Sequence, residues 1–278
     1  MIAQRPGIIA LVAGAAVAVF LVLPLLAVVP ISLTPARFLS MPNGALSLIH
    51  YRELIDNPDW LTSLLLSIRI GVVSSVLATA LAALFALGVW MYQPRFATML
   101  VGFVLLPMIV PPIVSAMALY FLLTALSRVT NVVGYDTWLG VALAHVIMIS
   151  PFAVVLILVA LAQVDRRIDL AARGMGASVW QRVGIVILPN IKFGLLTALL
   201  LCFVLSWEEI GVTLFITSTS AITLPRLMWM GVHDNIDPAV AAISVLLISV
   251  TTFVLVGRMV ISASPWSRGR DGSPASTT

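Results

Sequence analysis

The chain has 278 residues, of which 61% are hydrophobic and only 9% are charged. Because soluble domains carry about 25% charged residues, this composition excludes a soluble protein and indicates an integral membrane protein. The formal net charge of +4 is small and the sequence has no nucleic-acid-binding motif, which excludes nucleic acid as a partner. The single cysteine, Cys202, lies in a hydrophobic run and cannot form a disulfide within the chain.

The first hydrophobic run extends from about residue 8 to residue 29. It is longer than the apolar core of a signal peptide and long enough to cross the roughly 30 Å of membrane hydrocarbon, so we expect a retained first helix. Residues 30–60 are mixed in character and rich in proline and acidic side chains. They predict an external segment with a short amphipathic helix near residues 46–55.

Two further hydrophobic runs follow at residues 61–90 and 98–126. The second of these contains Pro107, Pro111 and Pro112. Each proline removes a backbone donor, so we expect this helix to be kinked or interrupted, with the freed carbonyl groups facing neighbouring helices or a water-filled path. Two interpretations stay open, a tolerated kink or a lining of the substrate pathway to which Pro111 and Pro112 belong.

The remaining runs cover residues 139–161, 191–218 and 239–261, which gives six predicted spans. We therefore predict an all-α integral membrane protein with one transmembrane domain over residues 1–262 and a disordered cytoplasmic tail over residues 263–278. Ten lysine and arginine residues fall on one side of the spans and four fall on the other. By the positive-inside rule the side with ten is cytoplasmic, which places both termini inside.

Residues 163–189 form the one long polar interval between two hydrophobic runs. Ala171 and Ala172 are small enough for a helix to approach another protein closely, and Gly176 permits a turn. A docking face is predicted by apolar residues at helical spacings within a charged surround: Met175, Val179 and Trp180, with Asp169, Arg173 and Arg182 around them. The alternative interpretation is an ordinary cytoplasmic loop whose basic charge only follows the membrane topology.

The order of Ala171-Ala172, Gly176 and the closing Leu188-Pro189 resembles the EAA loop of permease subunits from binding-protein-dependent ABC importers. The resemblance implies two short helices with the glycine at the bend, the first of which docks into a cleft of the cytoplasmic ATPase. Leu170 stands where that family usually has a glutamate, and the only nearby carboxylate is Asp169. The residues that the resemblance assigns to coupling are Asp169, Ala171, Ala172, Arg173, Gly176, Ala177, Leu188 and Pro189.

A second polar group, Ser206-Trp207-Glu208-Glu209, lies deep in the fifth run. A carboxylate within the membrane costs on the order of 3 kcal/mol, so this pair is expected to face the bundle interior or a watery cavity. Adjacent helical residues diverge by about 100°, so at most one acid points into a pathway. We expect an acidic gate for a cationic substrate, with Trp207 available for cation–π contact. The alternative is that the acids bond to backbone groups or to an arginine of a partner subunit.

The other polar residues inside or beside the runs have structural interpretations. Arg69 is expected either to pair with one of the two glutamates or to extend to the outer membrane surface. His145, alone in an apolar run, is expected to be a hydrogen-bonded packing residue. Because His50 and His233 lie in different external segments, we predict no metal site.

The external loop before the sixth run is polar and aromatic. It predicts either a dock for a binding protein or a solvated cap, formed by Trp229, Met230, His233, Asp234 and Asp237.

Between about residues 57 and 260, four segments in order look like the second permease subunit of spermidine/putrescine-type ABC importers: PMIVPP, DLAARGMGAS, SWEEIGVTLF and LPRLMWMGVHDNIDPAVAAISVLL. The resemblance implies a six-helix type I permease in the bacterial inner membrane. It also implies a second, homologous permease subunit, two cytoplasmic ATP-binding subunits and a periplasmic substrate-binding protein. The expected substrates are putrescine and spermidine, and the expected mechanism is alternating access.

No catalytic role is expected for this chain. It has no P-loop of the form GxxxxGK[ST], so the partner subunits must bind ATP and magnesium, and no cofactor is expected here. An intramembrane enzyme is disfavoured because there is no HExxH motif and no sign of a Ser-His-Asp arrangement. Two alternatives remain: an importer of another small cationic or amino-acid-like solute such as γ-aminobutyrate, or a secondary transporter that needs no ATPase.

Overall fold

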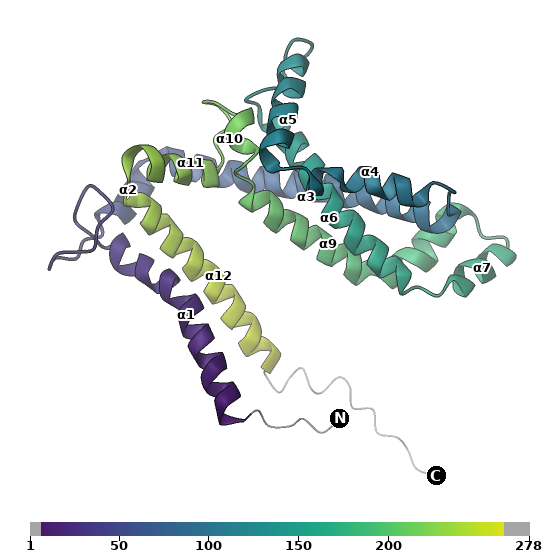
Figure 1. Ribbon diagram of the computed structural model, residues 1–278, viewed down its shortest axis with the longest axis horizontal. Helices are drawn as coiled ribbons and strands as arrows, with labels where there is room; N and C mark the ends of the chain where they lie inside the picture. The colour runs from purple at the N-terminus through teal and green to yellow at the C-terminus, as the bar shows by residue number, and fades with distance from the viewer. Residues whose placement is uncertain (1–6, 264–278) are drawn as a thin grey trace. The chain divides into compact units, whose positions relative to one another are not determined.

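The computed structural model describes residues 7–263, and every regular element in this range is a helix. The chain divides into two compact units. The first combines the residues up to Pro58 with those from Met228 onward, and the second runs from Asp59 to Leu227. Figure 1 shows the helices of both units.

The first unit contains α1 (Ile8–Ser32), α2 (Ile49–Asp56), η2 (Gly231–Asn235) and α12 (Ala239–Ala263). α1 and α2 both pack against α12, which lies far from them in the sequence. The short helix predicted near residues 46–55 is confirmed as α2. The side chains of α1 are exposed over most of its length, as a lipid-facing helix requires.

The second unit is built on α3 (Pro58–Tyr92), α6 (Trp138–Ala162) and α9 (Leu188–Glu208). Lipid tails are as apolar as the helix surfaces, so such helices associate through small side chains that let backbones approach. The buried face of α3 is a stripe of this kind, made by Ser63, Ser67, Gly71, Ser74, Ala78, Ala82 and Ala86. The Ser74 hydroxyl donates to the Ala142 carbonyl oxygen of α6 at 3.1 Å, which fixes the register of the two helices.

The third hydrophobic run is interrupted rather than merely kinked. It forms α4 (Ala97–Ile109) and α5 (Pro112–Leu126), whose axes differ by 100°. Val110 and Pro111 between them have extended backbone with ψ near 136° and 135°. Pro112 then begins α5, where its missing N–H leaves no helical bond unmade.

The fifth run corrects the prediction of one helix over residues 191–218. α9 stops at Glu208, and after four non-helical residues a single turn, α10 (Thr213–Ile216), follows. Hydrophobicity alone predicted a continuous span because the run is apolar on both sides of the break. At its other end α9 is continuous with the π-helical η1 (Arg182–Ile187), so the helix begins before the predicted residue 191.

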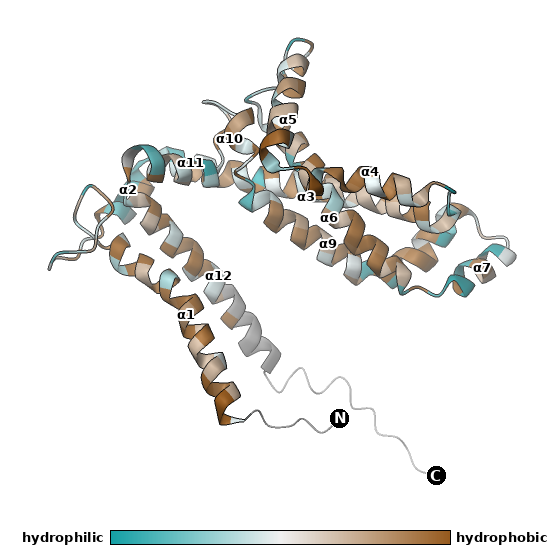
Figure 2. Ribbon diagram, in the orientation of Figure 1, coloured by the Kyte–Doolittle hydropathy of each residue, from teal (hydrophilic) through white to brown (hydrophobic). Residues whose placement is uncertain are grey.

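Within the described residues, four helical segments are long and apolar enough to cross a membrane: α1, α3, α6 and Val179–Glu208, which ends in α9. The bent pair α4–α5 makes a fifth if it is taken as one span. The apolar segment Ala239–Phe253 of α12 is shorter. Figure 2 shows these helices as mainly hydrophobic and α7 (Arg166–Gly174) as mainly hydrophilic. The predicted division at residue 262 stays a prediction, because residues 264–278 lie outside the described part of the chain.

Candidate functional site

The polar loop between α6 and α9 has the predicted bend at Gly176. This glycine has φ +83°, a backbone region that strains other residues. Its N–H donates to the Arg173 carbonyl oxygen at 3.0 Å, and the Ala177 N–H donates to the Ala172 carbonyl oxygen at 3.1 Å. These two bonds form a Schellman motif, which ends α7 and turns the chain.

Side-chain caps define both arms of this loop. The Asp165 carboxylate accepts from the Arg167 N–H at 2.9 Å and starts α7. The Ser178 and Gln181 side chains exchange hydrogen bonds with each other's backbone N–H groups and start α8 (Val179–Gln181). The loop is therefore two short helices with a glycine between them, as the resemblance to the EAA loop implied.

An ion pair joins α7 to the first residue of η1, which directly follows α8. Arg182 Nε donates to Asp169 Oδ1 at 2.8 Å, and Arg182 Nη2 donates to Asp169 Oδ2 at 2.5 Å. The Arg182 and Asp169 side chains are only 11% and 10% exposed. Asp169, predicted to border the ATPase-docking face, thus binds within its own chain.

The loop also presents an exposed apolar face. Leu170, Met175 and Trp180 are 61%, 82% and 81% exposed. Of the residues that the resemblance assigns to coupling, Ala171, Arg173, Gly176 and Pro189 are exposed, Ala177 and Leu188 are half-buried, and Asp169 and Ala172 are buried. Pro189 lies in the first turn of α9, as predicted.

The two helix breaks in the second unit meet at a cavity of about 200 Å³. Its lining comes from α4, α5, α6 and the end of α9. Glu209 and Pro112 both belong to it, whereas Pro111 lies in the break between α4 and α5. A Cβ added to Gly211 would lie 3.5 Å from Glu209 Oε1 and 3.9 Å from Pro112 Cβ, so little space separates the two breaks.

The two predicted gate acids have different surroundings. Glu209 Oε1 accepts from the Val212 N–H at 2.9 Å, and the Glu209 carbonyl oxygen accepts from the Thr213 hydroxyl at 2.7 Å. Glu209 therefore stabilises the break while it lines the cavity. Glu208 ends α9 with its side chain exposed on this chain. Trp207 is half-buried, and its ring centroid lies 6.2 Å from that of Phe203.

His145 holds the same break together from α6. Its Nδ1 lies 2.8 Å from the Ser206 hydroxyl oxygen and its Nε2 lies 3.0 Å from the Thr213 hydroxyl oxygen. Because these residues lie on either side of the break, one imidazole fixes both ends, and the prediction of a packing residue is confirmed. Arg69 does not pair with either glutamate: its guanidinium lies 3.6 Å from the centroid of the Trp138 ring.

Asp136 is a structural residue that the sequence reasoning missed. Its carboxylate accepts hydrogen bonds from four consecutive N–H groups, those of residues 218–221, at 2.7–3.2 Å. Burial alone would raise the pKa of this carboxyl, but the four donors favour the ionised form and lower the pKa to about 2. More than 80 residues separate the partners, so no local pattern signals the contact.

In the first unit, the structure places His50 beside two carboxylates, whereas no metal site is predicted from the sequence. His50, Glu53 and Asp237 can place one ligand atom each within 4.8 Å of the others. The two chain segments are distant in sequence, and the packing of α2 against α12 brings them together.

Comparison with known proteins decides the family. Residues 78–263 match the family described as "Binding-protein-dependent transport system inner membrane component". The chain belongs to this family. The matched range contains both helix breaks and the whole loop from Asp165 to Pro189.

Curated relatives cover most of this permease. It is 30% identical over 201 residues to a probable molybdenum ABC transporter permease protein of Haloferax volcanii, covering 70% of this chain and 74% of the relative. It is 25% identical over 240 residues to the putrescine transport system permease protein PotI of Escherichia coli, covering 84% of each. A crystal structure of a bacterial ABC transporter involved in the import of the acidic polysaccharide alginate has the same fold, with a TM-score of 0.64 at 16% identity and coverage of 92% and 95%.

The chain is therefore a membrane-embedded permease subunit of an ABC importer with a type I helical bundle. In general terms, a permease of this kind works with an ATPase and a substrate-binding protein.

Proposed function

We propose that this permease carries a small organic cation, a polyamine such as putrescine or spermidine. The observation that supports this proposal is the position of Glu209 at the cavity where the two helix breaks meet. All other residues that line this cavity are apolar. A carboxylate in such surroundings attracts a cation and disfavours an anion, because there is little water to screen its charge.

The bonding of Glu209 leaves it able to bind a substrate ammonium group. One N–H, that of Val212, occupies Oε1, and the carboxylate can accept further hydrogen bonds at Oε2. The likeness to a putrescine permease along 84% of both chains agrees with a cationic solute. The competing candidate is another small cationic or amino-acid-like solute such as γ-aminobutyrate.

Energy for transport comes in this proposal from two ATP-binding subunits that dock on the loop between α6 and α9. Leu170, Met175 and Trp180 form an exposed apolar face that a cytoplasmic partner would cover. Movement of the ATPases would pass through α7 and the Asp169–Arg182 ion pair into η1 and α9. A second, homologous permease completes the pathway, and both termini lie in the cytoplasm.

The test is ATP-dependent uptake by the complete transporter in proteoliposomes. We expect saturable uptake of putrescine or spermidine, with no uptake of molybdate and none without ATP. Glu209→Gln keeps an oxygen that can accept from Val212 but removes the charge, so we expect kcat/KM for the polyamine to fall at least tenfold. Glu208→Gln is the matched control, because that side chain lies outside the cavity lining.

Two results would overturn parts of the proposal. Uptake of γ-aminobutyrate alone would assign the permease to the competing solute. Unchanged polyamine kinetics in Glu209→Gln would make that carboxylate a structural cap only.

A further inference from the structure

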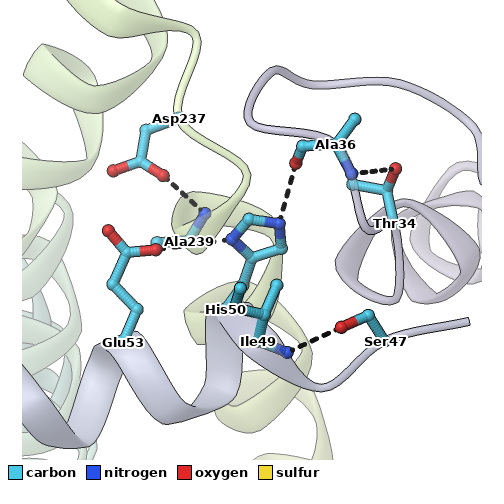
Figure 3. Close-up of polar contacts among 8 residues, drawn as sticks. All are labelled: Thr34, Ala36, Ser47, Ile49, His50, Glu53, Asp237 and Ala239. Carbon is cyan, nitrogen blue, oxygen red and sulfur yellow. Dashed lines mark hydrogen bonds and ion pairs between the residues drawn. The ribbon is translucent and has the colours of Figure 1, made fainter.

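Three side chains capable of binding a metal meet in the first unit, as Figure 3 shows. His50 and Glu53 lie one turn apart on α2, and Asp237 lies just before α12. His50 is buried at 4% exposure, Asp237 is half-buried and Glu53 is exposed. The cluster thus combines one buried ring nitrogen with carboxylate oxygens on a side open to solvent.

A backbone contact determines which nitrogen of His50 faces the carboxylates. Nε2 lies 3.0 Å from the Ala36 carbonyl oxygen. A carbonyl oxygen can only accept, so Nε2 must carry the hydrogen, and in the neutral ring Nδ1 has a free lone pair. Histidines that bind metals commonly donate their other N–H to a backbone carbonyl in this way.

The distance on the other side of the ring fits shared coordination better than a direct hydrogen bond. Nδ1 lies 3.4 Å from Glu53 Oε2. That is longer than the usual 2.7–3.2 Å of an N–H···O bond. It matches the roughly 3.3 Å that separates two ligand atoms on a tetrahedral ion with bonds of about 2.0 Å.

Two hydrogen bonds to backbone groups hold Asp237 in place. Its N–H donates to the Gly231 carbonyl oxygen at 2.7 Å, and its Oδ1 accepts from the Ala239 N–H at 2.8 Å. These bonds fix the side chain at the start of α12, beside His50 and Glu53 (Figure 3). Among the side chains that the structure describes, no lysine or arginine forms a salt bridge with Glu53 or Asp237.

We propose that His50 Nδ1, Glu53 Oε2 and a carboxylate oxygen of Asp237 form a binding site for a divalent transition-metal ion of the zinc type. One imidazole and two carboxylates are ligands that zinc accepts, and three protein ligands leave a fourth position for water. The three ligand atoms lie within 4.8 Å of one another, so binding requires the carboxylates to draw closer around the ion. The ion would then link α2 directly to the segment before α12.

The test uses the full chain in lipid nanodiscs, purified without a polyhistidine tag and treated with a chelator. Zinc is titrated by calorimetry, and Co²⁺ is used as a spectroscopic probe. We expect one zinc ion per chain, and a loss of affinity of at least tenfold in Glu53→Gln and in Asp237→Asn. Asp237→Asn keeps the oxygen that accepts from Ala239. The visible Co²⁺ band of a tetrahedral site with nitrogen ligation should be absent in His50→Gln.

Matched controls separate this site from adventitious binding. Asp56→Asn removes another exposed carboxylate of α2, and His233→Gln removes the exposed histidine that lies 2.9 Å from Asp234. Both should bind zinc like the unchanged protein. Zinc should also raise the thermal midpoint of the unchanged protein but not that of Glu53→Gln, a surface change that folding tolerates.

Three outcomes would overturn the proposal. The first is binding of less than about 0.2 zinc ions per chain, and the second is a zinc affinity in Glu53→Gln and Asp237→Asn equal to that of the unchanged protein. The third is a thermal midpoint of the unchanged protein that zinc does not raise.

Discussion

The ion pair between Asp169 and Arg182 offers a quantitative test of how the coupling loop is held. It consists of two charge-assisted hydrogen bonds at 2.8 and 2.5 Å between side chains that are 10% and 11% exposed. Removing one partner of a fully buried pair costs about 3–5 kcal/mol. Because this pair lies close to the surface, we expect about 3 kcal/mol for Asp169→Ala, near the lower end of that range.

A loss of that size changes how often the loop opens. Since about 1.4 kcal/mol corresponds to a factor of ten, the open population should rise roughly 100-fold. Hydrogen exchange measured by mass spectrometry on peptides from residues 166–187 reports this population. We expect Asp169→Ala and Arg182→Ala to lose protection by a similar factor, because each leaves the other charge unpaired. Arg173→Ala, a charge change on the exposed side of α7, should have little effect.

The charge-exchanged double variant Asp169→Arg/Arg182→Asp decides whether the pair acts inside the chain. If it does, this variant should regain part of the protection and part of the ATP-driven uptake that the single variants lose. If Asp169 instead binds the ATPase, the exchange would restore neither. Protection that falls less than threefold in Asp169→Ala would refute the reasoning that the Asp169–Arg182 ion pair holds the loop closed.

Three further predictions concern Gly176, Asp136 and His145. Gly176→Ala should destabilise the loop by about 1 kcal/mol, because φ +83° strains a residue with a Cβ, whereas Gly174→Ala, in ordinary helix with open space around it, should not; hydrogen exchange of the loop compares them. The pKa of Asp136 is lower in the folded protein, so its contribution to stability is present above its ordinary value of 3.8 and is lost as the pH falls toward 2. Asp136→Asn should therefore lower the thermal midpoint at pH 7, and the difference from the unchanged protein should shrink on acidification. His145→Leu should cost about 2–3 kcal/mol by thermal unfolding, since it removes both hydrogen bonds that hold the ends of α9 and α10.

The sequence by itself determined the features that depend on local chemistry. Runs of apolar residues fixed where the long helices lie, since backbone groups in lipid must bond within a helix. Pro111 and Pro112 fixed the interruption of the third run, because a proline in a helix interior removes a backbone donor. Gly176 fixed the bend of the polar loop, and the order of small residues around it resembles that of the importer family.

Only the tertiary structure decided the contacts between distant residues. The fifth run was predicted as one helix because hydrophobicity contains no information about individual hydrogen bonds. The Glu209 carboxylate accepts from the Val212 N–H in place of a helical carbonyl oxygen. Asp169 looked free for a partner because Arg182 comes near it only after the chain turns at Gly176. The donors to Asp136 lie more than 80 residues away, and His50 meets Asp237 only through the packing of α2 on α12. These pairings depend on how the helices pack in space, and residue spacing along the chain contains no record of that packing.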